Sequence, residues 1–195
     1  MNSIKHNAAA NDEIHGNGAE RPGELVLGLL KHRIRPCGDV LSETERYLPR
    51  PRLDKRLSEA LRPRRILHLE APSGFGKTVA MAAAVGSAGA ADQQAFRIVL
   101  SDRESDPSRL LALLQLVLGD DNAPERDASQ GCLADRLSLL LAGSPWQQPE
   151  RAGVLVLDNL EAITSAGSLN LIQQLAEELP AAMALGLCSR GAVRL

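Results

Sequence analysis

Eight residues, APSGFGKT from Ala71 to Thr78, combine the residue types that a phosphate-binding loop requires. Gly74 and Gly76 have no Cβ, so the backbone N–H groups at these positions can approach an anion closely. Lys77 adds a positive charge for the β- and γ-phosphates, and the Thr78 hydroxyl is a magnesium ligand. The run follows the Walker A pattern G-x-x-x-x-G-K-[ST], except that an alanine replaces the first glycine. It predicts a site for ATP or ADP with Mg²⁺, formed by Pro72, Ser73, Gly74, Phe75, Gly76, Lys77, Thr78 and Val79.

A second candidate motif is VLVLDNLE, from Val154 to Glu161. Asp158 ends an apolar run, where the acid of a Walker B motif would hold magnesium, together with Thr78. Hydrolysis also requires a carboxylate that orients or activates water, and this residue often follows the Walker B aspartate directly. Here the next residue is Asn159, which cannot accept a proton. Glu161 is therefore a catalytic candidate, with a solvated charge at the start of a helix as the alternative.

A third candidate is Arg190, which follows Ser189 at the end of the apolar run AMALGLCSR. At the end of a strand, an arginine is placed to detect a γ-phosphate or to help orient the attacking water. We therefore predict a catalytic sensor role for it. A surface arginine that merely follows a strand explains the pattern equally well.

The elements that must position these residues alternate along the chain. Apolar runs predict strands over residues 65–70, 95–101, 153–159 and 182–190. Helical periodicity and capping residues predict helices over 53–61, 78–88, 106–121, 132–143 and 168–180. Such alternation is typical of a parallel sheet with helices on both sides, whose ligands bind at the carboxyl ends of the strands. We therefore predict an α/β, three-layer P-loop NTPase fold with an extra strand between the Walker A and Walker B strands.

Composition excludes several other classes. The formal net charge of −2 does not favour nucleic-acid binding by the whole molecule. Three scattered cysteines without a CxxC pair disfavour a disulfide framework or zinc site and fit a reducing compartment. We predict a cytoplasmic protein, because no secretory signal or membrane span is evident. Residues 1–23 are polar and predicted to be a disordered tail. Residues 24–195 form the predicted ATPase core.

Taken together, the motifs resemble those of the nucleotide-binding domain of STAND-class ATPases, in particular the MalT-like transcriptional regulators of the LuxR family. APSGFGKT resembles the family's Walker A, LVLDNLEAI its Walker B strand, and LCSR its sensor strand. LSDRESDPSRLLALL is similar to the segment after the second strand. LPRPRLDKRLSEAL is similar to the segment before the phosphate loop, and this match adds Arg50 and Arg52 to the predicted nucleotide-binding residues. Asn159 departs from the pair of acids usual in the family's Walker B.

The resemblance implies a switch in which ATP and ADP favour different states. Self-association through the ATPase domain and DNA binding through a C-terminal helix-turn-helix would belong to a longer protein. The chain ends after the fourth predicted strand, so we expect a core that is incomplete at its C-terminal edge, with weak or no ATP hydrolysis in isolation.

Three other functions are compatible with parts of the sequence. A small-molecule or nucleoside kinase would share the phosphate loop but would need an arginine-rich lid and an acceptor pocket. A remnant would keep the fold without the switch. A nucleic-acid-binding module would use the basic residues before the loop, although aromatic stacking residues are scarce. These basic residues are Arg46, Arg50, Arg52, Lys55, Arg56, Arg62, Arg64 and Arg65.

Overall fold

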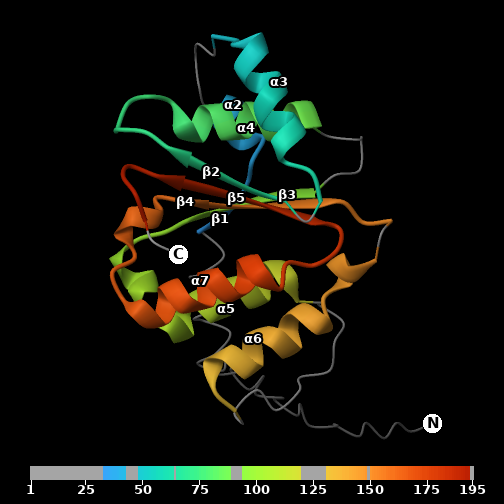
Figure 1. Ribbon diagram of the computed structural model, residues 1–195, viewed down its shortest axis with the longest axis vertical. Coiled ribbons are helices and arrows are strands. Elements are labelled where there is room, and N and C mark those ends of the chain that lie inside the picture. Colours follow the sequence, from blue (N-terminus) through green and yellow to red (C-terminus); the bar gives the residue numbers. More distant parts are fainter. Residues whose placement is uncertain are drawn as a thin grey trace, which may run out of the picture.

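The computed structural model describes residues 33–42, 48–63, 65–88, 94–119, 131–148 and 150–193 (Figure 1). Within them the chain forms one five-stranded sheet in the order β1-β3-β4-β5-β2. Its strands are β1 (Ile34–Pro36), β2 (Ile66–Glu70), β3 (Gln94–Val99), β4 (Gly153–Asp158) and β5 (Met183–Ser189). The tail predicted for residues 1–23 lies outside the described residues.

The sheet confirms the predicted fold class. Strands β2, β5, β4 and β3 run parallel in this order, and β1 adds an antiparallel edge beside β3. Between the strands that carry the two motifs, β3 intervenes in the sequence and β5 intervenes in space. The short β1 was not predicted, because three residues carry too little periodicity to indicate a strand. The result is a three-layer P-loop NTPase fold with a mostly parallel sheet.

Helices cover both faces of the sheet (Figure 1). One face carries α2 (Asp39–Ser42), α3 (Pro51–Ala60) and α4 (Lys77–Ala88), and the other carries α5 (Pro107–Leu118), α6 (Leu133–Ala142) and α7 (Ala166–Glu177). Short 3-10 turns, η1 (Asp102–Ser105), η2 (Pro145–Gln147) and η3 (Leu160–Ala162), lie in the connections. Asp106, the first residue of the helix predicted over 106–121, caps α5 by accepting a hydrogen bond from the Ser108 N–H at 2.9 Å.

The central strand β4 separates two apolar cores. All six of its residues are buried, as expected for a parallel strand covered on both faces. Leu155 and Leu157 belong to the larger core, with residues of α5, α6 and α7. Val154 and Val156 belong to the smaller core, with Met81 and other residues of α4. The alternation of leucine and valine therefore gives α4 the less bulky side of the strand.

Strand β5 allows α4 to approach the sheet closely. A Cβ at Gly186 would lie 2.9 Å from the Met81 sulfur and 3.3 Å from a methyl carbon of Val156. On the helix side, the contact is made by small residues such as Ala80 and Ala84, both buried. Because α4 begins at the phosphate loop, this packing fixes the position of the loop relative to the strand ends.

The substitution Gly186→Ala is expected to destabilise the protein by about 1–3 kcal/mol, because the added methyl group overpacks the contact with Met81. Urea unfolding followed by circular dichroism measures the difference. Gly86→Ala is the matched control, since a Cβ there meets no atom within 4 Å. In the helix it should leave stability unchanged or raise it by up to about 1 kcal/mol. Equal effects of the two substitutions would contradict the proposed packing constraint.

All three cysteines are free thiols, but they differ in exposure. Burial raises the pKa of Cys37 and of Cys188 from 9.0 to about 12, and the Asp158 carboxylate acts in the same direction. Cys132, at the start of α6, is exposed. The two buried thiols therefore remain protonated and inaccessible at neutral pH.

Labelling with a chromogenic disulfide reagent at pH 7 should therefore modify Cys132 alone in the folded protein and all three cysteines after denaturation. Modification of Cys188 as fast as Cys132 would show that the smaller core opens readily.

The raised pKa values of Cys37 and Cys188 predict that stability contributed by the buried thiols is present below about pH 9. This stability is lost as the pH rises toward 12, because the unfolded thiols ionise first.

Candidate functional site

The loop between β2 and α4 has the backbone conformation that its glycines predict. Gly74 and Gly76 have φ angles of 82° and 74°, in the left-handed region that favours glycine. Ala71 has no positive φ, since Asn159 is the only non-glycine residue among those described that does. An alanine therefore fits where the pattern usually has its first glycine. At the end of the loop, the Ala80 N–H donates to the Gly76 carbonyl and begins α4.

Lys77 folds back over this loop. Its ammonium group donates hydrogen bonds to the carbonyl oxygens of Ala71 at 2.6 Å and Pro72 at 3.1 Å. The side chain is half-buried, so its ammonium group stays at the loop and does not extend into solvent. The N-terminus of α4 adds the positive end of its helix dipole at the same place. The loop therefore concentrates positive potential where the sequence predicts phosphate.

A hydrogen bond connects the two predicted motifs. The Thr78 hydroxyl donates to Asp158 Oδ2 at 2.9 Å, and Asp158 Oδ1 accepts from the Asn159 N–H at 3.0 Å. Within the described residues, no group of three acidic, histidine or cysteine side chains could hold a metal ion. Two converging oxygens fit Mg²⁺ that also takes oxygens from phosphates and water, as this ion does in nucleotide sites. The donor set thus fits a magnesium–nucleotide complex rather than a metal bound by protein alone.

Asn159 has a structural role that its position after Asp158 did not reveal. It adopts φ 67° and ψ 42°, a left-handed conformation that asparagine tolerates better than most residues. Its side-chain amide donates to the Leu100 carbonyl, just after β3, at 3.0 Å. The residue in the usual position of a hydrolytic carboxylate is therefore a neutral donor tied to the neighbouring strand.

Glu161 and Arg190 form an ion pair at the same cavity. Arg190 Nε lies 2.8 Å from Glu161 Oε1, and the Arg190 backbone N–H donates to Oε2 at 3.1 Å. Glu161 lies in η3, directly after the Walker B strand, and Arg190 follows β5. The two catalytic candidates were predicted separately, and the structure brings them into contact.

These residues surround one cavity of about 540 Å³, within the size range of small-ligand sites. Most of the predicted residues line it, and Val99 and Asn159, which were not predicted to bind nucleotide, join them. Val99 ends β3, so its position at the same sheet edge was the signal that could have identified it. The lining residues are Ser73, Gly74, Gly76, Lys77, Thr78, Val79, Val99, Asp158, Asn159, Glu161 and Arg190.

Four predicted residues do not line the cavity. Pro72 contributes only the carbonyl that Lys77 contacts, and the Phe75 side chain is exposed. Arg50 precedes α3, and its guanidinium group lies beside the loop, 3.5 Å from where a Cβ of Gly76 would stand. Arg52 is exposed on α3.

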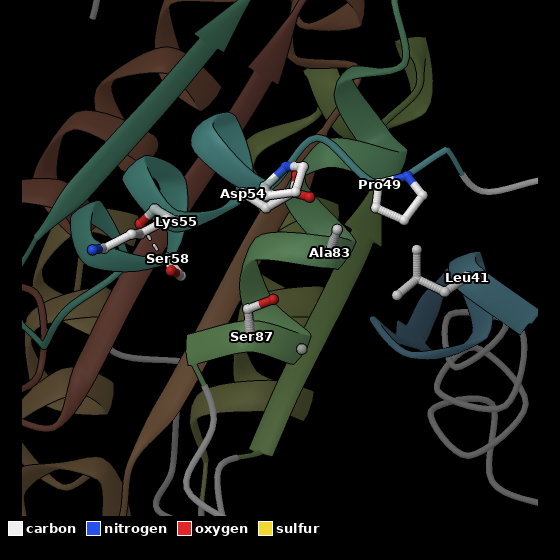
Figure 2. Close-up of a pocket in the computed structure, with 9 residues that line it drawn as sticks. Leu41, Pro49, Asp54, Lys55, Ser58, Ala83 and Ser87 are labelled. Atoms are coloured by element: carbon white, nitrogen blue, oxygen red, sulfur yellow. Dashed lines mark hydrogen bonds between the residues drawn. The ribbon is translucent and has the colours of Figure 1, made fainter.

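A second hollow, of about 660 Å³, lies between α2, α3 and α4. Figure 2 shows Lys55 and Ser58 on α3, Ala83 and Ser87 on α4, and Leu41 on α2 around it. It shares no lining residue with the loop cavity. Lys55, one of the basic residues before the loop, is exposed at this groove, and Arg46 and Arg64 lie outside the described residues. The other exposed basic residues before the loop are Arg50, Arg52, Arg56, Arg62 and Arg65.

Introducing an acid in place of Asn159 should be unfavourable, because the new carboxylate would face the Leu100 carbonyl without a proton to donate. We expect Asn159→Asp to lower the free energy of unfolding by about 1–3 kcal/mol at pH 7. The loss should shrink below about pH 4, where the new carboxyl can donate a hydrogen bond.

Urea unfolding at pH 7 and pH 4 tests this expectation. The matched control is Asn170→Asp, since Asn170 is exposed on α7 and its change should alter stability by less than about 0.5 kcal/mol. A pH-independent loss in Asn159→Asp would show that the hydrogen bond to Leu100 does not carry the effect.

No protein-family model matches the chain, and no curated protein does either. Among solved structures it is similar to PCH-2 from C. elegans, at 11% identity and a TM-score of 0.39, with 74% of this chain covering 36% of that one. It is similar to Drosophila ORC bound to AT-rich DNA and Cdc6, at 15% identity and a TM-score of 0.41. That match covers 87% of this chain and 51% of the other. It is also similar to the E. coli MS115-1 HORMA:CdnC:Trip13 complex, at 16% identity and a TM-score of 0.35. That match covers 88% of this chain and 55% of the other.

The chain therefore spans about a third to just over half of the solved chains that it matches. Likenesses at these TM-scores assign no function. The described part of the chain contains no helix long and apolar enough to cross a membrane. Its fold is established by its own strand order, the glycine conformations of the loop and the junction of Thr78 with Asp158: it is that of a P-loop NTPase.

Proposed function

We propose that the chain binds ATP and ADP with Mg²⁺ at the loop cavity and acts as a regulatory switch domain. The observation that carries this proposal is the hydrogen bond between Thr78 and Asp158. This bond joins residues that are 80 positions apart in the sequence. It lies beside the phosphate loop, whose Gly74 and Gly76 have the positive φ angles that such a loop requires. A phosphate loop without this junction would lack the oxygens that complete a magnesium site.

Each residue of the cavity has a role in this proposal. Backbone N–H groups of the loop and the N-terminus of α4 would bind the phosphates. The ammonium of Lys77 would exchange the carbonyls of Ala71 and Pro72 for phosphate oxygens, which are charged and therefore stronger acceptors. Thr78 and Asp158 would hold Mg²⁺, which when bound neutralises phosphate charge.

The same cavity supports binding more strongly than hydrolysis. Asn159 cannot activate water, and its amide is bonded to the Leu100 carbonyl. Glu161, the remaining carboxylate candidate, is paired with Arg190. We therefore propose weak or no ATP hydrolysis by this chain alone, in keeping with a switch whose state depends on the bound nucleotide.

The finer proposal, a switch domain of a signal-responsive transcription regulator of the MalT-like kind, is supported by the segment before the loop. By its resemblance to that family, Arg50 and Arg52 would lie near the nucleotide, and the Arg50 guanidinium lies beside Gly76. In such a regulator, self-association would involve the ATPase domain, and DNA binding would be the task of a helix-turn-helix elsewhere in a longer protein.

Calorimetric titration of ATP and ADP in the presence of Mg²⁺ tests the proposal. We expect Lys77→Ala to weaken binding of both nucleotides by at least about tenfold, because charged hydrogen bonds to the phosphates are lost. Lys55→Ala is the matched control, since Lys55 is exposed on α3 and does not line the loop cavity. Removal of Mg²⁺ by a chelator should also weaken ATP binding.

Failure of the folded, unsubstituted chain to bind either nucleotide would contradict the proposal and favour a remnant that keeps only the fold. Equal loss of binding in Lys77→Ala and Lys55→Ala would place the nucleotide elsewhere. Fast turnover that depends on an added acceptor would instead favour a kinase.

A further inference from the structure

The ion pair between Glu161 and Arg190 occupies the cavity wall. Both residues line the cavity, and both carboxylate oxygens of Glu161 contact Arg190, one through the guanidinium and one through the backbone N–H. Among the described residues that line the cavity, the only other cationic side chain is that of Lys77, which contacts the loop carbonyls. Arg190 is therefore the cation in this wall that a carboxylate of the chain itself neutralises.

The backbone beside Arg190 is fixed, whereas its side chain has room to move. Ser189 is fully buried, and its hydroxyl donates to the Gly191 carbonyl at 2.8 Å. Since that hydroxyl uses its proton there, it accepts from Nε2 of His68, on the neighbouring strand β2, at 2.7 Å. The Arg190 side chain is 61% exposed. A change of partner for Arg190 therefore requires new rotamers of one side chain but no shift of the strand.

The strength of this ion pair suits a contact that a ligand can replace. The Arg190 side chain is 61% exposed and that of Glu161 26%, so water screens this pair in part. A partly screened ion pair of this kind shifts an equilibrium by roughly fivefold, because both side chains also lose freedom. A terminal phosphate presents a higher charge and three acceptor oxygens, and arginine binds such groups with paired hydrogen bonds. Arg190 should therefore exchange Glu161 for a phosphate that comes within reach.

We propose that Glu161 sets the preference of the site for ATP over ADP by competing with the γ-phosphate for Arg190, an inference that rests on the proposed nucleotide binding and on the sensor role predicted for Arg190. With ADP, Arg190 stays paired with Glu161. With ATP, the γ-phosphate takes the Arg190 guanidinium from Glu161 Oε1, and this new contact favours the triphosphate. Oε2 keeps its hydrogen bond from the Arg190 backbone N–H. Glu161 is a positioning residue that sets the cost of the contact between Arg190 and the third phosphate.

The test measures dissociation constants for ATP and ADP, with Mg²⁺, in the unsubstituted chain, Arg190→Gln, Glu161→Gln and the double variant. Arg190→Gln should weaken ATP binding by at least about tenfold and leave ADP binding within about twofold. Glu161→Gln should strengthen ATP binding by about two- to fivefold, because Arg190 no longer has a competing partner. ADP binding should not respond to this change.

The double variant separates competition for Arg190 from simple charge repulsion. If Glu161 acts only through Arg190, its substitution should have no effect once Arg190 is glutamine. A gain in ATP affinity that persists in the double variant would show that the carboxylate merely repels phosphate, and it would overturn the proposal. Equal changes in ATP and ADP affinity in Arg190→Gln would also overturn it.

Two matched controls account for the loss of a surface charge. Glu150 and Arg151 are exposed just before β4, at the end of that strand opposite Asp158. Glu150→Gln and Arg151→Gln should leave both dissociation constants within about twofold. If the chain binds ADP but the variants do not alter its preference for ATP, the ion-pair proposal fails while the proposed function stands. If the chain binds neither nucleotide, both fail.

Discussion

The close approach of α4 to the sheet is the constraint on which the candidate site depends. At Gly186, the space that a side chain would take is occupied by Met81 and Val156. Since α4 starts at Lys77, its distance from β4 and β5 fixes where the lysine and the threonine lie relative to the strand ends. The 2.9 Å contact between Thr78 and Asp158 is the outcome of that packing. A bulkier interface would separate the two motifs, because closely packed interiors do not deform without cost.

The parallel sheet adds a second constraint by collecting polar groups at one edge. Asp158 ends β4, and Arg190 follows β5, the neighbouring strand. Asp158 follows the last apolar residue of β4, and Arg190 follows the buried Ser189, so each reaches the cavity while the strand stays buried. Asn159 serves the same arrangement, since its left-handed backbone turns the chain away from β4 and its amide binds the carbonyl after β3. A residue at the usual catalytic position thus stabilises the wall of the cavity.

Both cations of the cavity have protein partners, which determines how a ligand can bind. Lys77 contacts two carbonyl oxygens, and Arg190 contacts a carboxylate. A phosphate must therefore replace these contacts, and its affinity is the difference between new and old interactions. The neutral carbonyls are weak competitors, whereas the carboxylate is a charged one. This difference makes the loop suited to general phosphate binding and the Arg190 side suited to selection among phosphates.

Local chemistry made much of this protein predictable from its sequence. Apolar runs, helical periodicity and capping residues indicated the strands and helices, and glycine at positions 74 and 76 indicated the loop conformation. These features depend on neighbours in the chain, which a sequence displays directly. The pairing of Glu161 with Arg190 and the bond from Asn159 to Leu100 join residues 29 and 59 positions apart. Only the tertiary structure decided them, because contacts between distant residues depend on strand order and on how closely α4 packs, which no local pattern specifies.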